Sequence, residues 1–234
     1  MNWEGRMNSK GPSLRSLNAW NKRTRKFLAI LNRALELLQM ETHLPTAEVE
    51  LNRKLHFCLL QATRELYPTE EIAPSQECNN QPDPDDEARA RRENKRPDFQ
   101  WIYLDRYEAD PLRCSRQFVV ECKRLGHPLR SDRILNALYV EEGVWRFLTP
   151  DSGYAKGFPS AAMVGYWQDM VADDILREVN EAASKRGVSR LNLSREGWRS
   201  GGVSKLDHRC ERPFPISPLL IYHLWADLRG TPNG

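Results

Sequence analysis

Hydrophobic residues in the first third of the chain recur at the three- and four-residue intervals of an α-helix. One apolar stripe runs from Ser13 to Met40, and a second begins after Pro45 and extends to about Leu66, with Thr46 as the expected N-cap. The sequence therefore predicts two amphipathic helices. Their stripes consist of Leu14, Leu17, Trp20, Phe27, Leu31, Leu35 and Leu38, and of Leu51, Leu55, Cys58, Leu59, Ala62 and Leu66.

Two acidic residues at the start of the second expected helix fall on opposite sides of it. Glu48 precedes Leu51 by three residues and so lies within the apolar stripe, whereas Glu50 lies toward solvent. Because burying an unpaired carboxylate is costly, an inward Glu48 needs a cation or a hydrogen-bond donor beside it. Glu48 is therefore a candidate site residue. The alternative is a first-turn acid that interacts only with the helix dipole.

Residues 68–96 show neither helical nor strand periodicity. Four prolines, an acidic run and then a basic run predict a mobile polar insertion at 76–96, preceded by at most a short strand near Glu71–Ala73. Charge runs of this kind are usually solvated, although the basic half, which includes Arg96, could contact a nucleic-acid backbone.

Two short apolar segments follow, Phe99–Leu104 and Gln117–Cys122, and their aromatic and β-branched residues predict strands. Turn-forming residues lie between them, so we expect an antiparallel hairpin centred near Ala109–Asp110. In that register Asp98 lies opposite Glu121, with their Cα atoms roughly 5–6 Å apart.

Strand alternation adds a third residue to this pair. Glu121 and Lys123 point to the same face of their strand, a face that Asp98 can share, whereas Cys122 points to the other face and is assigned to packing. The sequence thus places two carboxylates and a lysine together at one end of the hairpin.

The second half of the chain alternates between further helical and strand patterns. The expected elements are a helix at Ser131–Val140 ended by Gly143, a short strand at Val144–Leu148, a core strand or helix start at Ala161–Trp167, a helix at Asp173–Arg186 with Gly187 as C-cap, an exposed connection at Leu191–Leu206, and a last apolar element at Leu219–Leu228. Together these indicate an α/β fold, a mixed central β-sheet flanked by helices with an N-terminal helical extension. We assign residues 1–44 to a tail and amphipathic helix, and 45–230 to the α/β domain.

Composition narrows the class of protein. A net charge of +3 on 234 residues excludes a strongly basic DNA-packaging protein, so nucleic-acid affinity has to come from local patches. Five cysteines without CxxC spacing favour reduced thiols over a disulfide framework. No signal peptide is recognised, and the longest apolar run, near Pro218–Leu224, is too short to span a bilayer. We therefore expect a cytoplasmic protein with no membrane association.

The chemistry of the hairpin residues suits a metal ion. Two carboxylates a few ångströms apart repel each other when both are ionised, and a hard divalent cation such as Mg²⁺ or Mn²⁺ relieves that repulsion. Such an ion can activate water and stabilise charge on a phosphate, and Lys123 could orient the water or balance that charge. Glu48 could be a further ligand or hold a metal-bound water. The alternative is an ordinary hairpin that carries a surface Glu121–Lys123 ion pair.

Pro97-Asp98 followed by Glu121-Cys122-Lys123 resembles the PD-(D/E)xK motif of the restriction-endonuclease-like nuclease superfamily. The resemblance implies a mixed sheet flanked by helices, with an acid on a helix, an Asp on the second core strand and ExK on the third. It further implies that Asp98, Glu121 and Glu48 are metal ligands and that Lys123 is the catalytic lysine. The segments Tyr139–Phe147 and Met163–Tyr166 are similar to members of such families linked to defence against phage.

Three features of the superfamily are not found in this sequence. No clear first core strand is visible in the proline-rich segment before Asp98. The helix expected at 131–140 lacks the QxxxY pair of the RecB-like branch, and the cysteine set of the iron–sulfur versions is missing. The resemblance therefore assigns no branch.

The sequence leads to one main functional hypothesis and two alternatives. The main hypothesis is a Mg²⁺-dependent endonuclease that hydrolyses phosphodiester bonds of DNA, with RNA not excluded, in defence against phage or other foreign DNA. Arg124, Arg146 and Arg96 are candidate nucleic-acid contacts. The alternatives are a non-catalytic module of the same fold that binds nucleic acid or protein, and a nuclease subunit active only within a complex. Besides DNA, the partners considered are a second copy of the chain, in a homo-oligomer, or the members of a larger defence complex.

Overall fold

The structure, a computed structural model, describes residues 13–80, 89–131, 133–214 and 216–230. Its described strands form one mixed sheet in the order β1-β2-β3-β4-β7-β6-β5. The central pairs β3–β4 and β4–β7 are parallel, and all other neighbours are antiparallel. In sheet order the strands are Ser75–Gln76, Phe99–Leu104, Ser115–Leu125, Ser160–Trp167, Leu219–Asp227, Val203–Cys210 and Asn192–Leu193.

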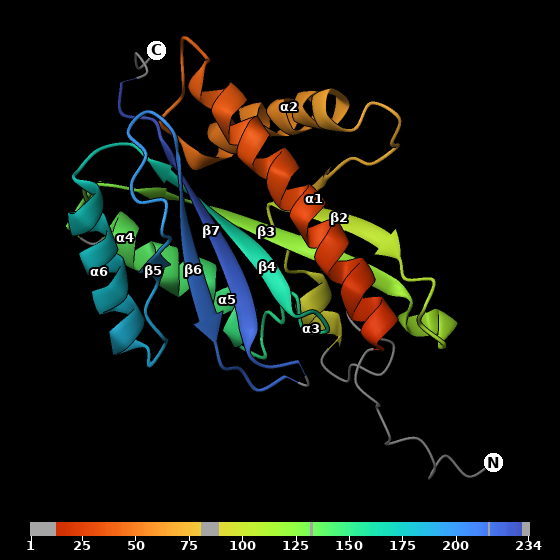
Figure 1. Cartoon of the computed structure of the whole chain (residues 1–234). Helices are drawn as coiled ribbons and strands as arrows, with labels where there is room; N and C mark the ends of the chain where they lie inside the picture. Colours follow the sequence, from red (N-terminus) through yellow and green to blue (C-terminus); the bar gives the residue numbers. More distant parts are fainter. Residues whose placement is uncertain (1–12, 81–88, 132, 215, 231–234) are drawn as a thin grey trace.

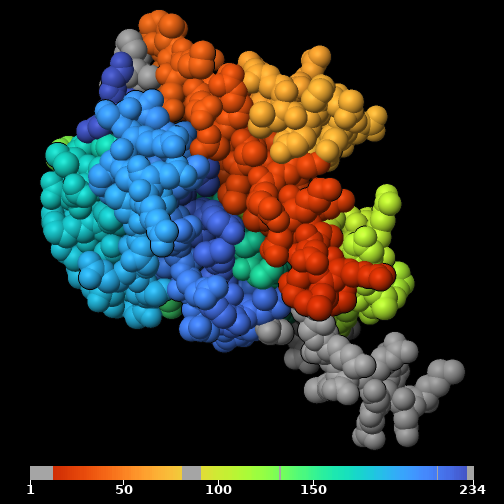
Figure 2. Space-filling model, in the orientation of Figure 1, coloured from red at the N-terminus to blue at the C-terminus, as the bar shows by residue number. Residues whose placement is uncertain are grey.

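Helices cover both faces of this sheet, which confirms the expected α/β fold (Figure 1). Helices α1 (Leu14–Gln39) and α2 (Glu48–Leu66) share one buried core with the sheet, and Figure 2 shows α1 lying across this face with α2 beside it. The opposite face packs against a second core. That side carries α4 (Leu135–Leu138), the π-helix η2 (Tyr139–Val144), α5 (Trp145–Leu148) and α6 (Ala172–Lys185).

The two predicted N-terminal helices form because their apolar stripes are buried. In α1, Phe27 stacks on Trp101 of β2 with ring centroids 5.0 Å apart, and the indole N–H of Trp20 donates to Ser160 Oγ at 2.8 Å. The prediction of Thr46 as the N-cap of α2 is wrong: the N-cap is Ala47, which makes no side-chain capping hydrogen bond. Thr46 instead offers its backbone carbonyl to Arg124, at 2.8 Å, so tertiary contacts fix the start of α2.

The proline-rich segment contains the short strand that the sequence left unclear. It lies at Ser75–Gln76 rather than near Glu71–Ala73, because these residues pair with Gln100 and Phe99 on β2. Of the predicted insertion at 76–96, residues 81–88 lie outside the described part of the chain, as does most of the predicted tail. The rest includes a short helix, α3 (Arg89–Glu93).

Three predictions for the second half of the chain are wrong: the helix stop at Gly143, the strand at Val144–Leu148 and the exposed connection at Leu191–Leu206. The expected helix begins at Leu135 and continues through Gly143 as a π-helix into α5, so Val144–Leu148 is helical and not a strand. Gly143 serves close packing rather than a helix stop: a Cβ there would lie 2.6 Å from Met163 Cε. The expected exposed connection at Leu191–Leu206 contains β5 and the start of β6, whose pairing becomes visible only in three dimensions.

The remaining elements follow the sequence pattern. The segment at Ala161–Trp167 is the central strand β4, and the last apolar segment is β7. Helix α6 ends as predicted, with Gly187 at a φ of +66° just after the C-cap Arg186. Among the described residues, no helix combines the length and apolar character needed to cross a membrane. The crossover from β3 to β4, residues 126–159, contains α4, η2 and α5, and it packs α4 and η2 against β3.

Candidate functional site

The β2–β3 hairpin has the register that the sequence predicts. Phe99 pairs with Val120 and Gln100 with Val119, which places Asp98, just before β2, beside the middle of β3. There the carboxylate oxygen Oδ2 of Asp98 accepts the backbone N–H of Cys122 at 2.6 Å. The loop before β2 is thus tied to the strand that carries the ExK residues.

Glu121 and Lys123 share one face of β3, as alternation predicts. The Lys123 Nζ lies 3.1 Å from Glu121 Oε1, and both side chains are buried, with Lys123 7% exposed and Glu121 fully enclosed. Cys122 faces the α1–α2 core, where it contributes to packing as expected, and burial raises the pKa of its thiol well above the ordinary value.

Helix α2 supplies the third carboxylate. Glu48 Oε1 accepts a hydrogen bond from Lys123 Nζ at 2.9 Å, and Glu48 Oε2 accepts the backbone N–H of Arg124 at 3.3 Å. Glu50 is exposed and forms an ion pair with Arg53 on its own helix. The structure therefore confirms the inward phase of Glu48, and it places this carboxylate on the lysine.

The two oxygens of the Glu121 carboxylate have different surroundings. Its Oε1 lies 2.6 Å from Arg146 Nη1 as well as near Lys123, whereas its Oε2 is buried and has no hydrogen-bond partner among the described residues. Burial, and then the charge of Asp98, raise the pKa of Glu121 to about 8. Burial likewise raises the pKa of Asp98 to about 6. For both carboxyl groups, the cost of burial therefore outweighs the stabilisation that Lys123 and Arg146 give to the ionised form.

Burial and the neighbouring carboxylates shift the pKa of Lys123 in opposite directions. Burial alone would lower its pKa, but the charges of Glu121, Asp98 and Glu48, together with the hydrogen bond to Glu48, outweigh burial and leave the pKa above the ordinary lysine value. The amine is therefore protonated at neutral pH. It acts as a fixed positive charge and hydrogen-bond donor inside the cluster.

A bound divalent cation would stabilise the ionised carboxylates of this cluster. The buried, unpartnered Glu121 Oε2 and the raised pKa of Asp98 both report carboxylates that an added positive charge would stabilise. No group of three or more His, Cys, Asp and Glu side chains in the described part of the chain is arranged to hold a metal ion. The candidate ligand set from the protein is accordingly Asp98 and Glu121, because Glu48 is engaged by Lys123.

Two further residues, which the sequence reasoning missed, hold Asp98. Asn52 Nδ2 donates to Asp98 Oδ1 at 2.9 Å, and the Tyr166 hydroxyl donates to Asn52 Oδ1 at 2.7 Å. The sequence did carry a signal for Asn52: it lies one helical turn after Glu48, on the inward side of α2. Nothing comparable marks Tyr166, whose position depends on the pairing of β4 with β3.

The three candidate arginines lie at different places relative to the cluster. Arg146, on α5, contacts Glu121 directly and lies with its guanidinium 5.9 Å from the ring centre of Tyr154. Arg124 borders the cluster through its backbone, while its guanidinium donates to the Thr46 carbonyl. Arg96 is exposed and donates to Asn79 instead. Arg146 is therefore the arginine that belongs to the site.

The π-helix brings Arg146 to the strand. A Cβ on Gly143 would lie 2.6 Å from Met163 Cε and 3.3 Å from Lys123 Cγ, so a larger residue there would have to displace the end of the Met163 side chain and shift Lys123. Helix α5 continues from η2 and carries Arg146 to Glu121. Single π-turns of this kind occur frequently at functional sites.

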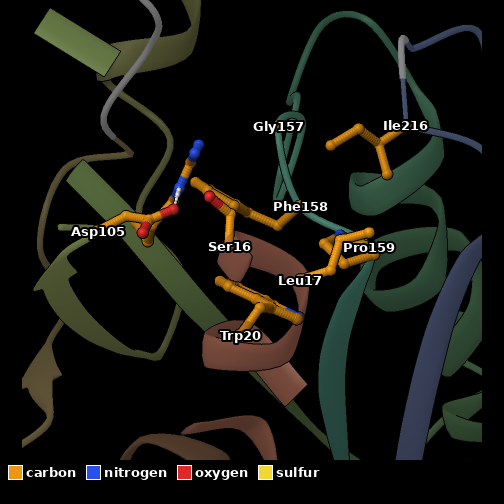
Figure 3. Close-up of a pocket in the computed structure, with 9 residues that line it drawn as sticks. Ser16, Leu17, Trp20, Asp105, Gly157, Phe158, Pro159 and Ile216 are labelled. Atoms are coloured by element: carbon orange, nitrogen blue, oxygen red, sulfur yellow. Dashed lines mark hydrogen bonds and ion pairs between the residues drawn. The ribbon is translucent and has the colours of Figure 1, made fainter. Parts of the chain in front are cut away.

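Two hollows of the molecule lie away from the cluster. One, of about 490 Å³, opens on the outer face of α2 and is lined by Leu60, Gln61, Arg64 and Glu65. The other holds only about 20 Å³, room for one water, between Ser16, Trp20, Asp105 and Phe158 (Figure 3). Neither is lined by Asp98, Glu121 or Lys123, so the carboxylate cluster is the candidate site on chemical grounds.

No protein-family model matches this chain, and neither a curated protein nor a solved structure does so.

Proposed function

We propose that this protein is a metal-dependent nuclease that hydrolyses phosphodiester bonds, with DNA as the expected substrate. One observation carries the proposal: the buried carboxylate of Glu121, one oxygen of which has no partner among the described residues, lies beside Lys123 at the point where Asp98 is tied to the same strand. An ordinary surface ion pair would leave Glu121 and Lys123 exposed, whereas both are buried.

The topology around these residues supports the same proposal. The PD-(D/E)xK superfamily carries its acid on a helix, its Asp on the second core strand and ExK on the third. Here Glu48 begins α2, Asp98 immediately precedes the second strand of the sheet, and Glu121 and Lys123 lie on the third. The short strand β1 takes the position of the first core strand.

Each side chain has a part that follows from its contacts. Asp98 and Glu121 would hold the divalent cation, Mg²⁺ or Mn²⁺, and the bound ion would lower the pKa of a water and stabilise charge on the phosphate. Lys123, protonated and held by Glu48, would stabilise the negative charge that develops during hydrolysis. Arg146, half-exposed beside Glu121, would contact a phosphate of the nucleic acid.

The test is cleavage of linear, circular and single-stranded DNA, and of RNA, by the purified protein with Mg²⁺ or Mn²⁺. We expect cleavage that EDTA abolishes, and we expect Lys123→Ala to lose it while keeping the folded far-UV spectrum. Unchanged cleavage by Lys123→Ala would remove that residue from the mechanism. Failure on every substrate with either metal would favour the non-catalytic module, or a subunit that requires a partner. We also propose, from the sequence alone, a role in defence against phage or other foreign DNA and a cytoplasmic location.

A further inference from the structure

We propose that Asn52 and Tyr166 are positioning residues, which together hold the Asp98 carboxylate in the orientation in which it binds the cation. This inference rests on the proposed metal-dependent function. It assigns roles to two side chains outside the PD…ExK motif, one on α2 and one on β4.

The three groups form one chain of hydrogen bonds, in which Tyr166 and Asn52 are buried. Tyr166 is fully buried and Asn52 is 4% exposed, so water does not substitute readily for either partner. The chain runs from the Tyr166 hydroxyl to Asn52 Oδ1, 2.7 Å, and from Asn52 Nδ2 to Asp98 Oδ1, 2.9 Å. It joins β4 and α2 to the loop before β2, three segments far apart in the sequence.

The direction of every hydrogen bond in this chain is fixed by chemistry. An ionised carboxylate only accepts, so Asn52 must turn its NH₂ group toward Asp98 and its carbonyl oxygen toward Tyr166. Tyr166 must then donate. The hydroxyl of Tyr166 thereby keeps the Asn52 amide from flipping, a flip that would turn the amide oxygen toward the carboxylate.

Asp98 is consequently held from two sides. Asn52 donates to Oδ1, and the backbone N–H of Cys122 donates to Oδ2 at 2.6 Å. These two donors, one from α2 and one from β3, define the plane of the carboxylate. Each oxygen accepts one hydrogen bond and retains acceptor capacity, which a cation could use. Groups that orient a ligand in this way typically change metal affinity about 10- to 100-fold when they are removed.

The chain offers a matched control on the other face of the sheet. Tyr139 is also fully buried, and its hydroxyl lies 2.7 Å from His223 Nδ1 and accepts from Trp225 Nε1 at 3.0 Å. Tyr139→Phe and Tyr166→Phe therefore each remove one buried, hydrogen-bonded hydroxyl and keep the aromatic ring. Only Tyr166→Phe touches the hydrogen bonds of Asp98.

The experiment compares Tyr166→Phe, Asn52→Leu, their double variant and Tyr139→Phe with the full-length wild-type protein. Mn²⁺ affinity is measured by isothermal titration at pH 8, and unfolding is followed without metal. A ¹⁵N–¹H spectrum records the side-chain amide signals of Asn52. We expect Tyr166→Phe and Asn52→Leu each to weaken Mn²⁺ binding about 10- to 100-fold. The double variant should be no weaker than the worse single one, and Tyr166→Phe should shift the Asn52 amide signals without metal.

The possible results separate this inference from the proposed function. Wild-type affinity in folded Tyr166→Phe and Asn52→Leu would overturn the inference while leaving the metal site in place. An equal loss of affinity in Tyr139→Phe would also overturn it, because general loosening of the fold would then explain the effect. A wild-type protein that binds no Mn²⁺ would overturn the proposed function, and with it this inference.

Discussion

Replacing Glu121 by glutamine tests the incompletely compensated buried charge on which the proposed site depends. Burial raises the pKa of this carboxyl from about 4.5 to about 8 in the folded protein. The folded state therefore retains a proton that the unfolded chain releases between these two values. Stability must fall as the pH rises through that interval, because the folded state binds more protons there. Glutamine keeps the shape of the side chain and removes the charge.

The difference between the unfolded and folded pKa values of Glu121 sets the expected loss of stability. Each pKa unit corresponds to about 1.4 kcal/mol, so the shift of Glu121 costs the wild type at most about 4 kcal/mol at pH 8 and almost nothing near pH 4. For a chain of this length that is on the order of 10 °C in melting temperature. Without Glu121, two carboxylates, Asp98 and Glu48, remain beside two cations, Lys123 and Arg146.

The assay is thermal unfolding of metal-free protein, wild type and Glu121→Gln, at intervals from pH 5 to pH 8.5. We expect the melting temperature of the variant to exceed that of the wild type by an amount that grows steadily with pH. Glu142→Gln, which neutralises an exposed carboxylate on η2, serves as the control and should follow the wild type. A variant that is less stable than the wild type by the same amount at every pH would refute the reasoning, because Glu121 would then be a fully compensated structural ion.

Three further predictions concern packing, substrate contact and metal. Gly143→Ala should lower the free energy of unfolding by about 1–3 kcal/mol in chemical denaturation, because its Cβ would meet Met163 and Lys123. Gly157→Ala, at a position with open space among the described residues, is the control and should leave it unchanged. Equal effects of the two substitutions would contradict the packing of η2. Arg146→Gln should weaken DNA binding and reduce the salt dependence of log Kd by about one phosphate contact. Arg177→Gln, on the exposed side of α6, is the control and should change neither. Identical salt slopes for the two variants would contradict a phosphate contact by Arg146. Mg²⁺ should raise the melting temperature of the wild type more at pH 8 than at pH 6, because Asp98 and Glu121 must be ionised to bind it. A rise that is the same at both pH values would place the ion elsewhere.

Local patterns were sufficient to predict the hairpin and its chemistry. The register that pairs Phe99 with Val120 follows from turn residues and strand lengths, and alternation then separates Glu121 and Lys123 from Cys122. Helical phase likewise distinguished Glu48 from Glu50. These features depend on residues close in sequence, or on a single turn between two strands.

Long-range packing explains what the sequence could not show. Strand β1 has two residues and exists because β2 offers it an edge, and β5 depends on β6 in the same way. Gly143 appeared to be a helix stop, yet its missing side chain allows contact with Met163, twenty residues further on. Tyr166 reaches Asn52 only because β4 pairs in parallel with β3.

Crystals grown with Mn²⁺ at pH 8 would test the central claim most directly, through the anomalous scattering of the metal. We predict one strong peak at about 2 Å from a carboxylate oxygen of Asp98 and from one of Glu121, and no peak there in Glu121→Gln. A wild-type protein that shows no peak between these two residues, or binds Mn²⁺ only elsewhere, would contradict it.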